Sequence, residues 1–179
     1  MLVQIVVIAV VLLVVGILAI VGLAALKPNT IHVERTLAMH APPERIFPLI
    51  SDFHQWRSWS PYENRDPEMQ RTYSGAASGT GAVYEWNGNN SVGAGRMEIL
   101  RSTPPSHVAI QLDFLRPFEG HNTAEFALQP QGDHTSVTWS MHGPARFISK
   151  LMSVFLNFDK MIGTDFENGL ANMKATAEK

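Results

Sequence analysis

Histidine is the residue type through which this chain of 179 residues could most readily perform acid–base or metal chemistry. A neutral imidazole accepts a proton or binds a metal ion, and two histidines one helical turn apart form a common metal-binding pair. The sequence contains no such pair and no HExxH-like motif. We therefore predict no metal site and no cofactor. The seven histidines are His32, His40, His54, His107, His121, His134 and His142.

Two of these histidines, His121 and His142, lie near the ends of predicted strands, where the mouth of a cavity would open. They are the candidates for a general base at such a mouth. His40, His107 and His134 fall at predicted turns, where an exposed side chain is typical. A surface position is the simpler interpretation for all five, and we assign no catalytic residue.

Tyr84 is the best-placed polar side chain for the inside of an apolar cavity, because it shares one face of a predicted strand with apolar residues. Acid–base catalysis there would require a buried group with a shifted pKa. Glu85, Asp113 and Glu125 alternate with apolar neighbours, so their side chains should point away from that face. A core tyrosine with a hydrogen-bonded hydroxyl is the structural interpretation of Tyr84. The sequence leaves open whether the chain is an enzyme.

The composition excludes several classes of function. The chain has no cysteine, which rules out disulfides, zinc–thiolate sites and thiol nucleophiles. Its 14 Lys and Arg against 16 Asp and Glu give a net charge of −2, and no basic run stands out. Binding to nucleic acid through a basic patch is therefore disfavoured. The composition does not determine an oligomeric state.

Residues 1–26 contain no charged side chain, and Gln4 is the one strongly polar residue among them. As a helix, residues 5–26 would rise about 33 Å, which matches a hydrocarbon core of roughly 30 Å. The alternative is a cleaved signal peptide, for which Gly22-Leu23-Ala24 is a tolerable cleavage triplet. A signal peptide would have a basic start and a shorter apolar run. We therefore predict an uncleaved, single-pass membrane anchor at residues 1–26.

A short linker, residues 27–30, follows the anchor and joins it to a single domain at residues 31–179. Lys27 and Arg35 follow the apolar run, and no Lys or Arg precedes it. The positive-inside rule then favours a cytoplasmic position for the domain.

The domain should begin with a strand and end with a long helix. Alternation of apolar and polar residues predicts strands at residues 31–39, 80–86, 95–101, 108–115, 122–128 and 136–142. Two short helices are expected after Pro43 and Asp52, and a helical period runs from residue 146 to about 177 with Gly163 as a bend. The fold class is α+β, because a bent antiparallel sheet of this kind buries one face against the closing helix.

Large apolar side chains on the two facing surfaces predict the wall of a binding cavity. Methionine and aromatic side chains suit a wall of adaptable apolar shape, although an ordinary core would use the same residues. In Trp56-x-x-Trp59 both rings share one helical face, which we interpret as fixing the short helices onto the sheet. The candidate ligand-binding residues are Tyr84, Trp86, Phe114, Phe126, Trp139 and Met141 on the sheet, with Phe155, Met161 and Phe166 opposite.

Several segments resemble the bacterial polyketide cyclase/dehydrase-like branch of the START-like (SRPBCC) superfamily of helix-grip domains. The resemblance covers about residues 31–178 and implies a helix-grip fold with a deep apolar cavity between sheet and C-terminal helix. Members bind lipids, hormones or polyketides, activate chaperones, or catalyse cyclisations and hydroxylations, so the fold alone selects none of these. The segments are residues 33–35, 41–47, 50–53, 56–61, 79–82, 84–86, 135–139 and 165–174.

The resemblance and the anchor together predict a membrane-tethered binding module. It would hold a small hydrophobic molecule, such as a lipid, isoprenoid or polyketide-like compound, near the lipid bilayer. One alternative is a cyclase or dehydratase that uses Tyr84 or a histidine at the cavity mouth. Another is a protein-partner-binding module akin to the chaperone-activating relatives.

Overall fold

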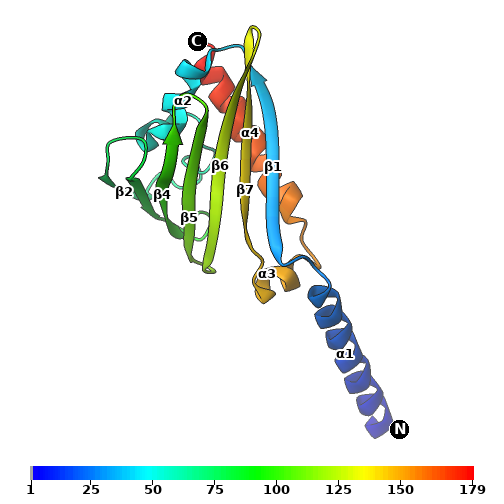
Figure 1. Cartoon of the computed structure of the whole chain (residues 1–179). Helices are drawn as coiled ribbons and strands as arrows, with labels where there is room; N and C mark the ends of the chain where they lie inside the picture. Colours follow the sequence, from blue (N-terminus) through cyan, green and yellow to red (C-terminus); the bar gives the residue numbers. More distant parts are fainter. Residues whose placement is uncertain (1) are drawn as a thin grey trace.

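The computed structural model describes residues 2–179 and has the predicted α+β architecture (Figure 1). The expected strands, short helices and C-terminal helix are all present, together with one strand, β2, that the sequence analysis missed. The elements are α1 (Leu2–Ala25), β1 (Thr30–Met39), α2 (Pro43–Ser51), the 3₁₀ helix η1 (Phe53–Ser58), β2 (Gln70–Gly75), β3 (Ala82–Asn87), β4 (Ala94–Thr103), β5 (His107–Arg116), β6 (Gly120–Gln131), β7 (His134–Pro144), α3 (Phe147–Met152) and α4 (Phe158–Ala177).

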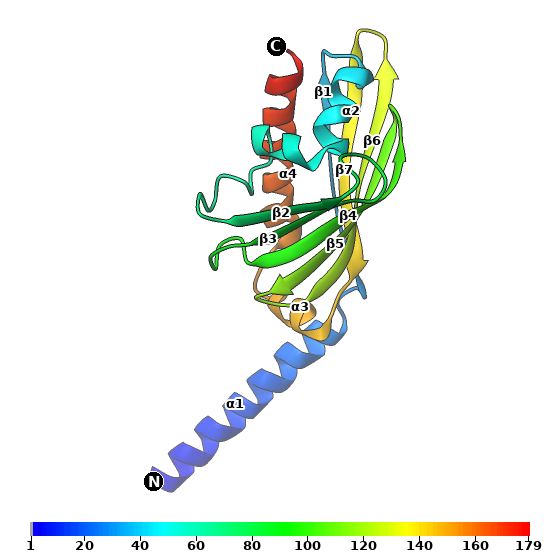
Figure 2. The ribbon, with the colours of Figure 1, turned by 90° about the vertical axis from the view of Figure 1, so that its left-hand side faces the viewer.

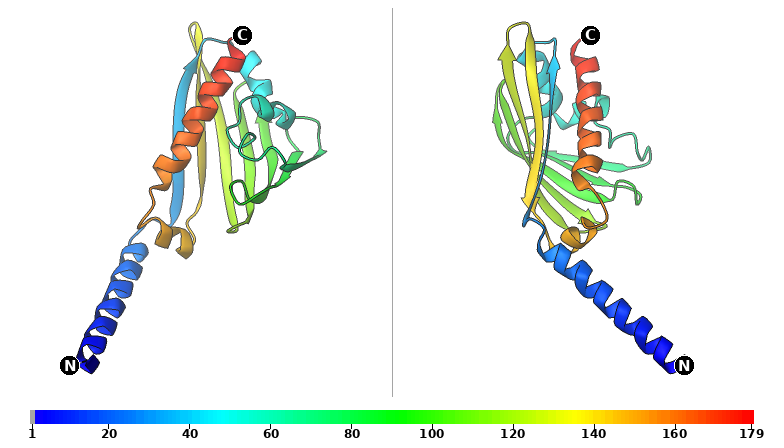
Figure 3. Two further views of the ribbon diagram at one scale, coloured as in Figure 1. Left: turned by 180° about the vertical axis from the view of Figure 1, so that it is seen from behind. Right: turned by 90° about the vertical axis from the view of Figure 1, so that its right-hand side faces the viewer.

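The seven strands form one antiparallel sheet in the order β1-β7-β6-β5-β4-β3-β2. The sheet curves strongly, and α4 lies on its concave side (Figures 2 and 3). Alternation along β7 places Val137, Trp139 and Met141 in the core. An α+β helix-grip fold is therefore confirmed.

Helix α4 packs mainly against the edge strand β1, and glycines allow the close approach. Arg35 of β1 reaches Asp159 at 3.1 Å and Glu167 at 2.7 Å, and its guanidinium occupies the space where Gly163 has no side chain. A Cβ atom at Gly169 would lie only 2.7 Å from the indole of Trp139. Glycine at position 169 therefore allows the helix to sit this close to the sheet, and glycine at position 163 leaves room for the Arg35 guanidinium.

The short helices are held to the sheet by two indoles. The Nε1 atom of Trp56 donates to the Ile50 carbonyl at 2.9 Å, and that of Trp59 donates to the Leu49 carbonyl at 2.8 Å. Both rings pack edge-on against Phe126 of β6. The structural role predicted for this tryptophan pair is confirmed.

The predicted long C-terminal helix is present as α4, but the helical stretch expected to run from residue 146 is interrupted before it. The helical stretch is divided into α3 and α4 by residues 153–157, and the side chain of Asn157 caps α4 by accepting the backbone N–H of Lys160 at 2.9 Å. Phe155 falls in the segment between the two helices, and Met161 lies in the first turn of α4. Their side chains are 69% and 53% exposed, so neither forms a wall opposite the sheet.

Helix α1 is an apolar helix that projects from the domain (Figure 1). Its residues are almost all exposed, but Ile20 and Ala24, one turn apart, are covered where the helix contacts α3. The apolar stretch Val3–Ala25 is long enough to cross a membrane. Its length, composition and position fit a membrane span and a signal sequence alike.

Candidate functional site

The concave face of the sheet brings together seven of the nine predicted ligand-binding residues. Trp139 stacks on Phe166 of α4 with ring centroids 4.0 Å apart and on Phe126 at 5.0 Å. Around this stack lie the remaining four predicted sheet residues, Tyr84, Trp86, Phe114 and Met141. The other two predicted residues, Phe155 and Met161, lie elsewhere and are exposed.

This concave face is closed at one end and more open at the other. Along β5, Val108 and Ile110 are fully buried, whereas Leu112 and Phe114 are half-buried. Trp86 on β3 is also half-buried, and its ring meets Phe114 edge-on at 5.9 Å. The half-buried side chains lie far from the β1 edge on which α4 mainly packs. Apolar surface therefore remains accessible toward the end of β5.

One buried polar group borders this apolar surface, and a second lies in the closed part of the core. Asn122 of β6 is buried and is paired with Leu112 in the strand register. Trp139 is buried, and its Nε1–H has no hydrogen-bond partner among the described residues. An unsatisfied buried donor costs about 1–3 kcal/mol. Such groups are uncommon in folded proteins, so this donor requires a physical explanation.

Tyr84 is held in a buried ion-pair network, which sequence reasoning missed. Its hydroxyl donates to Glu63 Oε1 at 2.6 Å, while Arg71 Nε donates to Glu63 Oε2 at 2.7 Å. Burial and the hydrogen bond to Glu63 raise the pKa of Tyr84 well above its ordinary value. The phenol therefore remains neutral, and its proton is already donated to a protein carboxylate. Glu63 stands in a loop without periodicity, so no sequence pattern identified it.

The tyrosines should resist ionisation in the native protein. Burial is the largest cause of a raised pKa for Tyr62, Tyr73 and Tyr84. An unfolded tyrosine ionises near pH 10, so the stabilisation from these groups is present below that pH and is lost as the pH rises above it. In an alkaline titration, we expect the phenolate absorbance of Tyr62 and Tyr84 to appear together with loss of circular dichroism. Tyr84→Phe should remove one phenol from that step, and ionisation of Tyr62 and Tyr84 near pH 10 without unfolding would contradict the assignment.

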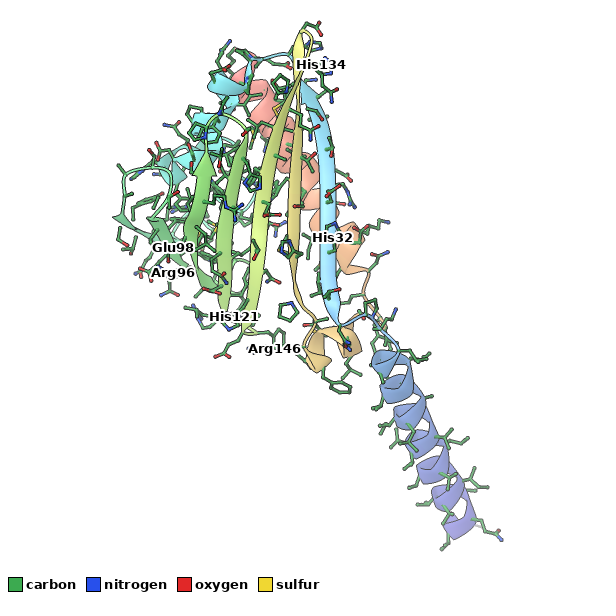
Figure 4. All side chains as sticks on the ribbon, in the orientation of Figure 1. His32, Arg96, Glu98, His121, His134 and Arg146 are labelled. Atoms are coloured by element: carbon green, nitrogen blue, oxygen red, sulfur yellow. The ribbon has the colours of Figure 1, made fainter. Side chains whose placement is uncertain are left out.

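The candidate histidines do not lie at a cavity mouth. His121, labelled in Figure 4, has its Nδ1 atom 2.7 Å from the Asp113 carboxylate on the convex face. His142 is also exposed, and it alternates with the buried Met141 along β7. Partial burial acts to raise the pKa of Asp113, but hydrogen bonds with His121 and Gln111 bring it below its ordinary value. The side chain of Glu125 approaches that of His107 to 3.7 Å. These pairs are surface features, so the surface interpretation of His121 and His142 agrees with the structure and the alternative of a general base at a cavity mouth does not.

Two hollows lie at the borders of the concave face. One, of about 190 Å³, is lined by residues that include Phe53, His54 and Tyr73. The other, of about 510 Å³, lies between the linker, the start of β1 and the segment joining α3 to α4, and includes Phe155. Within residues 2–179, no group of three or more His, Asp or Glu side chains is arranged to hold a metal ion.

Comparison with solved structures supports the fold. Protein CV1439 from Chromobacterium violaceum superposes with a TM-score of 0.59 at 16% identity, over 86% of this chain and 99% of that chain. Major latex-like protein 151 from Panax ginseng gives 0.61 at 12% identity, over 85% and 100%. The di-domain aromatase/cyclase StfQ of the steffimycin biosynthetic pathway gives 0.63 at 10% identity, over 84% of this chain and 51% of that chain. At these identities the likeness establishes the fold alone.

Comparison with family models is more specific. No curated protein matches the sequence. Residues 30–178, which contain the whole sheet and α4, match the family model described as polyketide cyclase/dehydrase and lipid transport. The chain therefore belongs to the polyketide cyclase/dehydrase and lipid transport family, a membership that points to a small hydrophobic ligand.

Proposed function

We propose that this protein is a membrane-tethered binding protein that holds a small hydrophobic ligand, such as a lipid, isoprenoid or polyketide-like molecule, against the concave face of its sheet. The observation that carries the proposal is the half-buried apolar surface of Trp86, Leu112 and Phe114. It continues an aromatic core that is otherwise closed. A ligand that covered this surface would gain roughly 25 cal/mol for each Å² of apolar area removed from water.

Two buried polar groups, one beside this surface and one deeper in the core, would orient a ligand that extends inward. Asn122 offers both a donor and an acceptor, and the Nε1–H of Trp139 offers an unpaired donor. A carbonyl or hydroxyl oxygen on the ligand would satisfy that donor. We therefore expect an apolar ligand with at least one hydrogen-bond acceptor.

Helix α1 would keep the domain beside the bilayer. Its apolar stretch is long enough to span a membrane, and four residues, 26–29, join it to β1. Tethering raises the local concentration of the domain near a pool of membrane-dissolved ligand. Lys27 follows the helix, and the positive-inside rule then favours a cytoplasmic domain. The cyclase alternative loses support because the Tyr84 hydroxyl already donates to Glu63.

Native mass spectrometry of the full-length protein, purified in mild detergent, tests ligand binding directly. We expect a bound small molecule that organic extraction recovers and identifies by class. Leu112→Trp should fill the accessible apolar surface and lower the bound fraction at least tenfold. The matched control is Leu100→Trp, at an exposed side chain of β4, which should leave binding unchanged.

Trp139→Phe separates the polar contact from apolar packing, since it keeps an aromatic ring and removes the N–H. It should weaken binding while the protein stays folded. A folded wild-type protein that carries no ligand and also fails to bind a fluorescent fatty acid would refute the proposal.

A further inference from the structure

Exposed apolar side chains gather at one end of the domain. Among residues 26–179, nine large apolar side chains are exposed, and all except Leu100 and Met161 belong to segments at the end of the domain that joins α1 (Figure 1). Soluble surfaces usually expose such side chains singly, whereas a cluster marks an interaction site. We call this cluster the anchor-end surface. It consists of Leu26, Leu115, Phe118, Phe147, Ile148, Phe155 and Leu156.

The anchor-end surface is built from segments that are distant in sequence. The β5–β6 hairpin contributes Phe118, α3 contributes Phe147, and the segment between α3 and α4 contributes Phe155. In the antiparallel sheet, β1 and β6 start, and β5 and β7 finish, at the end of the domain that joins α1. The surface therefore follows from the topology and does not reflect a single apolar segment.

The depth of α1 in a bilayer would bring this surface to the lipid headgroups. The helix would rise about 36 Å over its 24 residues, against a hydrocarbon core of roughly 30 Å. Ile20 and Ala24, in the last turns of α1, are covered where the helix contacts α3. If α1 spans the membrane, α3 therefore lies at the level of the headgroups.

The linker is too short to lift the domain away from that position. Only residues 26–29 separate α1 from β1, and four extended residues reach about 14 Å at most. The backbone N–H groups of Leu26 and Lys27 continue the helical hydrogen bonding to Gly22 and Ala24, which shortens the reach further.

The charges at this end suit a headgroup layer. Lys27, Arg146 and Lys150 lie beside the exposed apolar side chains, with Glu119 as a neighbouring acid at 3.4 Å from Arg146. Apolar side chains combined with Lys and Arg are the pattern of segments that lie in the membrane interface. The hollow of about 510 Å³ between linker, β1 and the α3–α4 segment is lined partly by these residues.

We propose that the anchor-end surface is seated in the interfacial layer of the bilayer that α1 spans, so that the 510 Å³ hollow opens toward lipid. This inference rests on the proposed membrane anchor and not on ligand binding. The occupant of the surface is the lipid bilayer itself.

The absence of cysteine allows a direct test, because a single introduced cysteine takes a fluorescent label at one position. Phe118→Cys and Phe155→Cys report on two separate segments of the surface, and Leu100→Cys is the matched exposed control outside it. Each full-length variant, labelled with the environment-sensitive dye NBD, is reconstituted into phosphatidylcholine vesicles containing phosphatidylglycerol. Flotation of the vesicles first measures whether the protein is anchored.

We expect the labels at positions 118 and 155 to emit at shorter wavelength and to lose fluorescence when the phosphatidylcholine is brominated on its acyl chains. The label at position 100 should show the emission of an aqueous dye and no quenching. If the protein floats with the vesicles but all three labels show the emission of an aqueous dye and no quenching, the membrane anchor is supported and the docked surface is refuted. If the protein does not float, the proposed anchor fails and this inference fails with it, whatever the ligand-binding result.

Discussion

Replacement of Glu63 by alanine should lower the free energy of unfolding by about 3 kcal/mol, near the lower end of the cost of breaking a buried ion pair. The Glu63 side chain is 5% exposed and accepts hydrogen bonds from both Arg71 and Tyr84. Its removal leaves a guanidinium and a phenol without their partner. The lower end of the range applies because the side chain of Arg71 is 13% exposed and retains some contact with water. Urea unfolding of the full chain in mild detergent, followed by circular dichroism, measures the change.

The control for this prediction is an ion pair of the same length on the convex face. Arg96 Nη2 lies 2.7 Å from Glu98 Oε2, but both side chains are about one-third exposed (Figure 4). Exposed pairs contribute roughly 0–1 kcal/mol, so Glu98→Ala should lower the free energy of unfolding by no more than about 1 kcal/mol. Equal effects of Glu63→Ala and Glu98→Ala would show that burial of the first pair does not matter.

Replacement of Trp139 by alanine should cost about 3–5 kcal/mol of unfolding free energy, the range for removing a large aromatic side chain from a core. The indole is stacked between Phe126 and Phe166 and meets Trp59 edge-on at 5.5 Å. Its loss removes the packing that joins Trp59, the residue after η1, and helix α4 to strands β6 and β7. The same urea unfolding experiment measures the loss.

Trp139→Phe should cost much less than Trp139→Ala in ligand-free protein. Phenylalanine retains stacking on Phe126 and Phe166, and the substitution removes a buried N–H that has no partner among the described residues. If Trp139→Phe destabilises the ligand-free protein as strongly as Trp139→Ala, the N–H is hydrogen-bonded after all. The structural argument for a ligand acceptor at this position would then be lost.

Local patterns were sufficient to predict most elements of this protein. Alternation identified β1 and β3 to β7, because the side chains of a strand point to opposite faces whatever its partners are. The uninterrupted apolar run identified α1, because the length of this run as a helix matches the thickness of a bilayer. Strand β2 was missed because its residues are half-buried or exposed and show little apolar alternation. The cap at Asn157 was also missed, and with it the division of the closing helix.

The sequence by itself therefore determined the fold class, the apolar helix and the concave-face set that includes Trp86, Trp139 and Phe166. These depend on periodicities that each segment carries within itself. The tertiary structure alone decided that Glu63 holds Tyr84, that the candidate histidines face outward and that exposed apolar residues from three separate segments meet beside α1. Each of these results depends on contacts between residues distant in sequence, and sheet curvature and helix placement decide which of those residues meet.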